Sequence, residues 1–138
     1  MSDLSDVRDG LKTAIEAEVD GWNVYTYAPR GLQVPAIWMN YEENDTVVVF
    51  KGNTIEGEIL VTAACYSDKE ADGWAQLEEV ISPTGGQSLI KGIRDNRNLN
   101  NKVDDAEVMA IENFRYENIE DMNLVAADVR VSFIKSIA

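Results

Sequence analysis

The stretch of this chain that comes nearest to a ligand-binding motif is residues 85–88, Gly-Gly-Gln-Ser, directly before a predicted helix. Free backbone N–H groups at the start of a helix can cradle a phosphate or another anion. A nucleotide-binding P-loop requires Gly-Lys-Ser or Gly-Lys-Thr at its end, and neither is present here. We therefore interpret this stretch as a turn followed by a helix cap.

Carboxylates are the other side chains that could do chemistry, and they are densest in two clusters. The clusters are Glu42, Glu43 and Asp45, and Asp104, Asp105 and Glu107. Neither cluster has the spacing of a calcium-binding loop, so we interpret both as solvated loop charge and predict no metal site. Glycosidic hydrolysis needs two acids that meet in one cleft. No spacing singles out such a pair among the 25 acidic residues, and a carboxylate-dependent hydrolase stays open as a minor alternative.

The chain contains no histidine, and this absence removes whole classes of chemistry. Ser-His-Asp and Cys-His relays, histidine acid/base catalysis and His-containing metal sites are excluded. The 138 residues carry 25 acidic against 12 basic side chains, for a formal net charge of -13. This charge repels phosphate, whereas nucleic-acid-binding proteins present basic surfaces. We predict that the chain is not an enzyme, has no catalytic residues and no cofactor, and does not grip nucleic acid.

Size and composition indicate one soluble domain that spans residues 1–138. This length is near the commonest domain size, and a hydrophobic content of 45% is enough for a packed core. No apolar run approaches the roughly 18 residues of a membrane span, and the N-terminus is acidic where a signal peptide would be basic. We expect a protein that is made in the cytoplasm and has no membrane partner.

Cys65 and the tryptophans fall on apolar stripes. We interpret the lone Cys65 as a small buried core residue, with a reactive thiol as the alternative. Trp22, Trp38 and Trp74 are interpreted as core or interface anchors. A base-stacking platform is disfavoured, because no basic groove accompanies them.

Apolar periodicity predicts an α+β fold, with an antiparallel or mixed β-sheet and helices packed on one face. Helical spacing covers residues 3–18, 69–81 and 89–93. Strand patterns cover residues 22–27, 35–41, 47–50, 55–66, 106–116 and 124–137. The first two strands are close in sequence, so we expect them to pair antiparallel. The imperfect alternation of residues 106–116 indicates a bulge or burial on both faces. The fold therefore begins with a helix and ends with a β-hairpin.

The apolar run Val47, Val48, Val49 and Phe50 follows a polar, acidic turn and has no evident partner stripe nearby. One interpretation is a further buried strand. The other is an extended arm that is covered only when another subunit packs on it. These four residues are our candidate subunit interface.

Several segments of the chain resemble one known family. They are residues 3–11 (Asp-Leu-Ser-Asp-Val-Arg-Asp-Gly-Leu), 24–29 (Val-Tyr-Thr-Tyr-Ala-Pro), 35–37 (Pro-Ala-Ile), 66–68 (Tyr-Ser-Asp) and 77–99, above all 82–93 (Ser-Pro-Thr-Gly-Gly-Gln-Ser-Leu-Ile-Lys-Gly-Ile). In this order they resemble the tail terminator proteins of long-tailed bacteriophages of the siphophage type, particularly those that infect actinobacteria. The family pattern has a Gly-Gly turn where this chain has Asn100-Asn101. Asparagine is the non-glycine residue best suited to left-handed backbone, so we expect the turn to be kept.

The resemblance implies an architectural role in the virion, at the head-tail junction. Such proteins form a homo-oligomeric ring, commonly a hexamer, that caps the head-proximal end of the tail tube and stops its polymerisation. The implied partners are the tail tube protein and the head-tail connector or stopper protein. DNA passes through the ring without specific binding, and repulsion from an acidic lumen keeps its phosphates off the wall. The resemblance implies no active site and no cofactor. Another connector or stopper component of the same particle stays open as the alternative.

Overall fold

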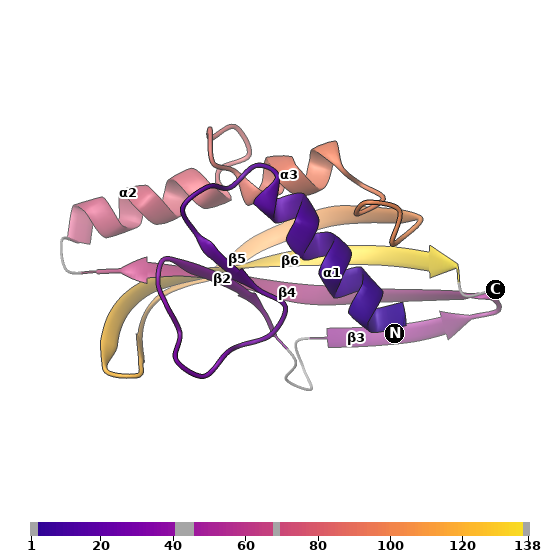
Figure 1. The fold of residues 1–138 in the computed structure, drawn as a ribbon, viewed down its shortest axis with the longest axis horizontal. Helices are drawn as coiled ribbons and strands as arrows, with labels where there is room; N and C mark the ends of the chain where they lie inside the picture. The colour runs from indigo at the N-terminus through magenta and orange to yellow at the C-terminus, as the bar shows by residue number, and fades with distance from the viewer. Residues whose placement is uncertain (1–2, 41–45, 68–69, 137–138) are drawn as a thin grey trace.

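The computed structural model describes the backbone of residues 3–40, 46–67 and 70–136, and their side chains apart from those of residues 3, 46–48 and 70–72. It is an α+β fold in which a mixed six-stranded sheet is combined with three helices (Figure 1). In chain order the elements are α1 (Asp3–Glu16), β1 (Asn23–Tyr25), β2 (Ala36–Met39), β3 (Thr46–Lys51), β4 (Thr54–Tyr66), α2 (Glu70–Ile81), α3 (Leu89–Asp95), β5 (Asp105–Ile119) and β6 (Met122–Ser136). The predicted fold class, with its N-terminal helix and C-terminal hairpin, is confirmed.

The long strands β4, β6 and β5 form the middle and one side of the sheet, in the order β1-β2-β4-β6-β5 (Figure 1). β2 pairs with residues 61–64 of β4, and β3 pairs with residues 54–59 of the same strand. β2 and β3 therefore follow one another along one edge of β4, while β6 occupies the other edge. As a result, β3 and β5 lie at opposite sides of the sheet.

The main hydrophobic core lies between one face of the sheet and the three helices. Alternate residues of the central strands, such as Val61 and Val129, are fully buried on this face. The helices contribute Leu11, Leu77 and Ile93 to the same cluster. Side chains alternate across a strand and recur every three or four residues on a helix, which is why the sequence pattern predicts both buried sets.

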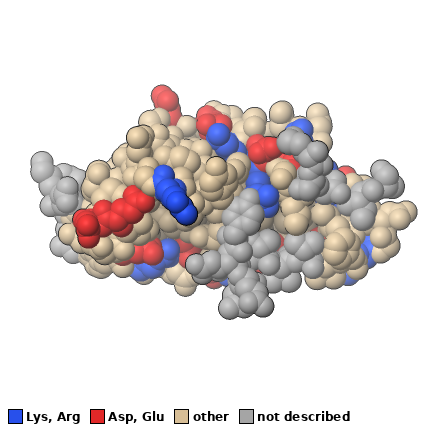
Figure 2. Space-filling model, turned by 60° about the horizontal axis from the view of Figure 1, so that its bottom comes forward, with Lys and Arg blue, Asp and Glu red and all other residues tan. Residues whose placement is uncertain are grey.

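Charged side chains are dispersed over the surface. Figure 2 shows a face on which most of the described surface is uncharged, with acidic and basic side chains in small separate groups. Some of these groups are ion pairs between elements, such as the 3.8 Å contact between Lys91 of α3 and Glu18 after α1. The acidic surplus is therefore not gathered into one patch on this face.

β1 and β2 are parallel, with Asn23 opposite Ala36 and Tyr25 opposite Trp38. Our expectation of an antiparallel pair, which rested on the short separation of the two strands, is wrong. The residues between them, 26–35, turn back along the sheet before β2 begins, so both strands run in the same direction. This connection is shorter than the dozen or more residues that parallel strands usually need.

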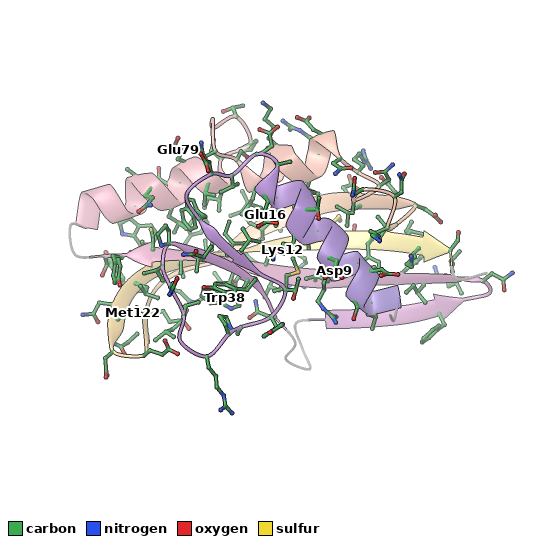
Figure 3. The ribbon with its side chains drawn as sticks, in the orientation of Figure 1. Asp9, Lys12, Glu16, Trp38, Glu79 and Met122 are labelled. Carbon is green, nitrogen blue, oxygen red and sulfur yellow. The ribbon has the colours of Figure 1, made fainter. Side chains whose placement is uncertain are left out.

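The connection between β1 and β2 packs on the sheet face opposite the helices, which is why it does not form a tight antiparallel turn. Its Leu32 joins a second, smaller cluster with Trp38, and Met122 packs against that cluster; Figure 3 labels both Trp38 and Met122. The Glu120 carboxylate accepts hydrogen bonds from the backbone N–H groups of Gly31 and Leu32, both at 2.9 Å. The connection is thus held to the turn of the C-terminal hairpin.

The turn after α3 has the backbone conformation that we expected of it. Asn100 and Asn101 have φ angles of 60° and 67°, in the left-handed region. The Asn100 N–H donates to the Asn96 side chain at 3.1 Å, and the Asn101 N–H donates to that of Asn98 at 3.3 Å. Asparagine therefore supplies here both the left-handed backbone that glycine would allow and the side-chain acceptors that fix it.

Candidate assembly surfaces

The candidate interface run, Val47 to Phe50, lies on β3, which is an edge strand. Its backbone pairs with β4, from Thr46 opposite Ile59 to Lys51 opposite Thr54, and no other described strand pairs with it. Gly52, with φ of 57°, forms the tight turn that joins the two strands. The apolar run therefore has a partner after all, the strand β4, which follows it directly in the sequence.

The edge strand β3 presents apolar side chains to solvent on both faces of the sheet. Phe50 is 73% exposed, more than any other large hydrophobic side chain that the structure describes, and Val49 is 47% exposed. Phe50 is opposite Ile55, on the face with the helices, whereas Val49 is opposite Glu56, on the other face. The interpretation as one more buried strand is wrong for these two residues, and the side chains of Val47 and Val48 lie outside the described set.

A second apolar surface runs along β5, on the other side of the sheet. A groove of about 380 Å³ lies between β5 and the helix layer. Its walls are Pro83, Ile90, Arg94, Arg97 and residues 106–111. A second hollow, which shares Pro83 and Ile111 with the first, continues it toward Phe114. We call this surface the β5 groove.

Two bulges in β5 account for the broken alternation of its sequence. The register with β6 shifts between Val108 and Ala110 and again between Glu112 and Arg115, as the first of our two interpretations, a bulge, requires. Met109 lies at the first shift and Phe114 at the second, and both side chains are more than half exposed. A bulge redirects a side chain that regular pleating would have sent to the opposite face.

The β5 groove was not predicted from the sequence. Its one sign in the sequence was the set of apolar residues that break the alternation of this strand. Tyr116, also exposed, lies further along β5, beside α2. There its ring meets Trp74 edge to face, with centroids 5.5 Å apart, and Trp74 Nε1 donates to the Tyr116 hydroxyl at 3.1 Å. Trp74 therefore packs partly on the core, as predicted, and partly on this exposed aromatic residue.

The sheet face opposite the helices carries a ladder of paired charges across three strands. Arg130 of β6 lies between Glu58 of β4 and Glu112 of β5, with a 3.3 Å contact to the first and a 3.0 Å hydrogen bond from Nε to the second. The hydrogen bond with Glu112 raises the pKa of the Arg130 guanidinium. Glu58 and Glu112 are therefore both paired with a permanently charged arginine, and neither carboxylate lacks a partner.

Next in the ladder is Asp128, a carboxylate that is 5% exposed and fully engaged. It accepts hydrogen bonds from the Thr62 hydroxyl at 2.7 Å and from Asn113 Nδ2 at 3.0 Å, and it forms a 3.1 Å ion pair with Arg115. A buried carboxylate is tolerated when its lone pairs are satisfied in this way. The arrangement favours a structural role for this face.

Residues 85–88 form a turn and a helix cap, as predicted. The Ser88 hydroxyl accepts from the Lys91 backbone N–H at 3.1 Å, and the residue caps α3. Gly85 is required by a close approach, since a Cβ atom there would lie 2.4 Å from the Glu79 carbonyl oxygen. Gly85 therefore allows the close packing after α2, and Ser88 caps α3.

The acidic cluster Asp104, Asp105 and Glu107 makes surface contacts, but Asp105 and Glu107 lie in β5 and not on a loop, so our expectation of loop charge is wrong for these two residues. Asp105 accepts two 2.8 Å hydrogen bonds from Arg97, which hold the pKa of that carboxyl below its usual value. Asp104 accepts from the Ser136 hydroxyl. The other cluster, Glu42, Glu43 and Asp45, lies outside the described residues. Within the described ranges, no group of three or more His, Cys, Asp or Glu side chains is placed to hold a metal ion.

Cys65 is a buried core residue, as the first of our two interpretations has it. It is 1% exposed, and its Sγ donates to the Gly73 carbonyl at 3.2 Å. Desolvation raises the pKa of the thiol to about 11, an effect that a backbone hydrogen bond from Leu77 partly offsets. The thiolate is the reactive form, so burial suppresses the chemistry of this residue.

We expect the Cys65 thiol of the folded chain to react very slowly with a thiol reagent at pH 8 and rapidly in 6 M guanidinium chloride, as followed by thionitrobenzoate release.

The raised pKa of Cys65 also makes the stability of the fold depend on pH. The folded thiol holds its proton above its ordinary pKa of 9.0, so this contribution to stability is full below pH 9 and is lost as pH rises toward about 11. Denaturation midpoints at pH 8 and pH 10.5 check this, with a Cys65→Ala variant as the control for other titrating groups. Rapid labelling of the folded chain would contradict the expectation.

Comparison with known proteins gives no family assignment. No protein-family model matches the chain, and no curated protein is similar enough to count as a match. None of the described helices is long and apolar enough to cross a membrane. The surfaces above are therefore interpreted from their own geometry.

Proposed function

We propose that the chain is a structural protein of a phage head-tail junction, a tail terminator that assembles into a ring of about six copies on the head-proximal end of the tail tube. In this role it stops polymerisation of the tube, meets the connector or stopper protein, and lets DNA pass. The proposal starts from the sequence resemblance, whose segments include the start of α1, the start of β2 and the region of α2 and α3. The left-handed turn at Asn100 and Asn101 supports it as well.

The observation that carries the proposal is the pair of apolar edges, β3 and the β5 groove, on opposite sides of one sheet. Exposed apolar surface of this kind marks sites of protein association. A chain with two different surfaces on opposite sides can associate head to tail, and such contacts produce a ring when the rotation between copies closes. This geometry supports a self-assembling role over an isolated monomer.

The net charge of -13 supports passage of DNA. In a ring of about six copies the charge is multiplied, and counterions within the Debye length of about 8 Å reduce but do not remove its effect. DNA phosphates then meet a wall that offers them few partners.

Mass photometry and negative-stain electron microscopy of the purified chain, alone and with the tail tube protein of the same phage, test the proposal. We expect rings of about six copies, and tubes that stop growing and carry a ring at one end when the chain is added. Monomers in every mixture would contradict the proposal. Rings that bind the head connector but leave tube growth unchanged would assign the chain to the connector or stopper class.

A further inference from the structure

We propose that the Glu120 carboxylate is a releasable latch, which holds residues 26–35 closed over the apolar cluster around Trp38. We call residues 26–35 the strap; they connect β1 to β2. The strap opens while the rest of the chain stays folded, and one side chain of the C-terminal hairpin sets how often it opens. This proposal goes beyond the proposed ring and does not depend on it, because opening and closing are properties of the single chain.

The strap buries little of its own surface. Leu32 is its one buried residue, whereas Tyr27, Arg30 and Gln33 are exposed. Segments that bury few apolar side chains open locally at a small cost in free energy. The strap is therefore held closed mainly by Leu32 and by the hydrogen bonds that its backbone makes.

The hydrogen bonds tie the strap at two places, its base and its tip. At the base, the Asn23 N–H donates to the Pro35 carbonyl and Asn23 Nδ2 donates to the Gln33 carbonyl, both at 3.0 Å. At the tip, Glu120 Oε1 and Oε2 accept from the Gly31 and Leu32 N–H groups, both at 2.9 Å. The base stays attached to β1, so loss of the Glu120 contacts frees the tip alone.

The tip of the strap has the backbone form of an anion site. Gly31 has a φ of 69°, in the left-handed region, and successive N–H groups that converge around such a residue bind anions. Hydrogen bonds from these groups to a carboxylate are charge-assisted and stronger than neutral ones. Glu120 is exposed, so water competes for its carboxylate and the contact is reversible.

The backbone of the hairpin turn supports a dedicated role for Glu120. Glu120 and Asp121 have φ angles of 50° and 63°, between the paired residues Ile119 and Met122. Asn, Asp and Gly are the residues that favour a left-handed two-residue turn, so Asp121 suits its position and Glu120 does not. A residue in an unfavoured backbone conformation is a marker of function. The longer carboxylate of Glu120 reaches the strap, which accounts for its presence in this turn.

Opening of the strap uncovers an aromatic side chain on the sheet face opposite the helices. Leu32 packs in one cluster with Trp38 and Leu124, which are 6% and 1% exposed, and Met122 packs against this cluster. Trp38 and Met122 are both labelled in Figure 3. The main core lies on the other face of the sheet, under the helices, so it stays covered when the strap opens.

Hydrogen exchange of the full chain, read by mass spectrometry at Gly31 and Leu32, tests the latch. We expect Glu120→Gln to speed exchange of these two N–H groups by at least about tenfold, because the neutral amide can accept from only one of them and hydrogen bonds to charged groups contribute the most. Peptides from β4 and β6 should exchange as in the wild type. The matched control is Asp121→Asn, which removes the same charge from the same turn and should leave the strap unchanged.

Trypsin gives a second measurement, because Arg30 places a cleavage site inside the strap. Proteases cut segments that open locally, so cleavage after Arg30 should also rise by at least about tenfold in Glu120→Gln. Glu120→Asp keeps the charge and suits the left-handed turn, but its side chain is one methylene shorter, so this variant should be cut faster than the wild type as well. All three variants should melt close to the wild type.

The possible results separate a latch from a general effect on stability. Wild-type rates of exchange and cleavage in Glu120→Gln would overturn the proposal. Equal acceleration by Glu120→Gln and Asp121→Asn would also overturn it, since the charge of the turn would then be responsible. Faster exchange throughout β4 and β6 would show that Glu120 stabilises the whole fold, with no separate opening of the strap. None of these results bears on ring formation, which the microscopy above tests by itself.

Discussion

Replacement of Asp128 by Ala is expected to lower the free energy of unfolding by about 3 kcal/mol. The carboxylate is 5% exposed and satisfies Thr62, Asn113 and Arg115 at once. Its removal leaves the Thr62 hydroxyl, which is 1% exposed, without its acceptor and takes from Arg115 one of its two carboxylate partners. An unsatisfied buried group costs more than the hydrogen bond was worth. Urea denaturation followed by tryptophan fluorescence measures the change.

Asp105→Ala is the matched control for Asp128→Ala, because both remove an aspartate that is paired with an arginine. The Asp105–Arg97 pair lies in solvent, with side chains that are 46% and 50% exposed, and surface ion pairs contribute little. Its melting temperature should stay close to that of the wild type. An equal loss of stability from the two variants would show that burial does not determine how much an aspartate–arginine pair contributes to the free energy of unfolding.

Gly92→Ala is expected to destabilise the fold by about 2–3 kcal/mol, although alanine is the better helix former by about 1 kcal/mol. A Cβ atom at Gly92 in α3 would lie 2.6 Å from the Ala14 carbonyl oxygen and 3.3 Å from Glu18 Cβ. The obstacle at Ala14 is backbone, so α1 and α3 must separate to admit the methyl group. Thermal melting detects the loss.

Gly86→Ala serves as the control for Gly92→Ala. No heavy atom lies within 4 Å of a Cβ atom built at Gly86, and its φ angle is not in the left-handed region. Alanine there restricts the unfolded chain without a clash, so stability should be unchanged or rise by about 0.5–1 kcal/mol. A stabilising effect at Gly92 as well would mean that α1 and α3 are not in close contact.

The regular parts of the fold were predictable from periodicity. The helices α1, α2 and α3 each bury one stripe of apolar residues, and β4 and β6 place alternate residues in the main core. This spacing is visible in the sequence. The direction of β2 relative to β1 was not predictable from the short separation of the strands, because the connection between them is held by residues far along the chain, such as Glu120. A short loop length alone favoured the wrong orientation.

The candidate interface was predictable only in part. The run that ends at Phe50 stood out because its apolar residues lack polar alternation, and the structure places it on an edge strand. The β5 groove was hidden, since Met109 and Phe114 looked like a flaw in a strand pattern until the bulges placed them on the surface. A groove between a strand and a helix is a property of packing, and one strand's sequence does not reveal it.

The pairing of β4 with β6 has a consequence for synthesis of the chain on the ribosome. Tyr66 at the end of β4 pairs with Leu124, and Thr54 at its start pairs with Ser136. At a translation rate of about 5–20 residues per second, β4 waits roughly 3–12 seconds before β6 exists. During this interval the nascent β3–β4 hairpin has an unpaired edge that can join the same hairpin of a neighbouring nascent chain. The fold thus forms late in translation, and the acidic side chains distributed along the chain keep neighbouring nascent chains apart until then.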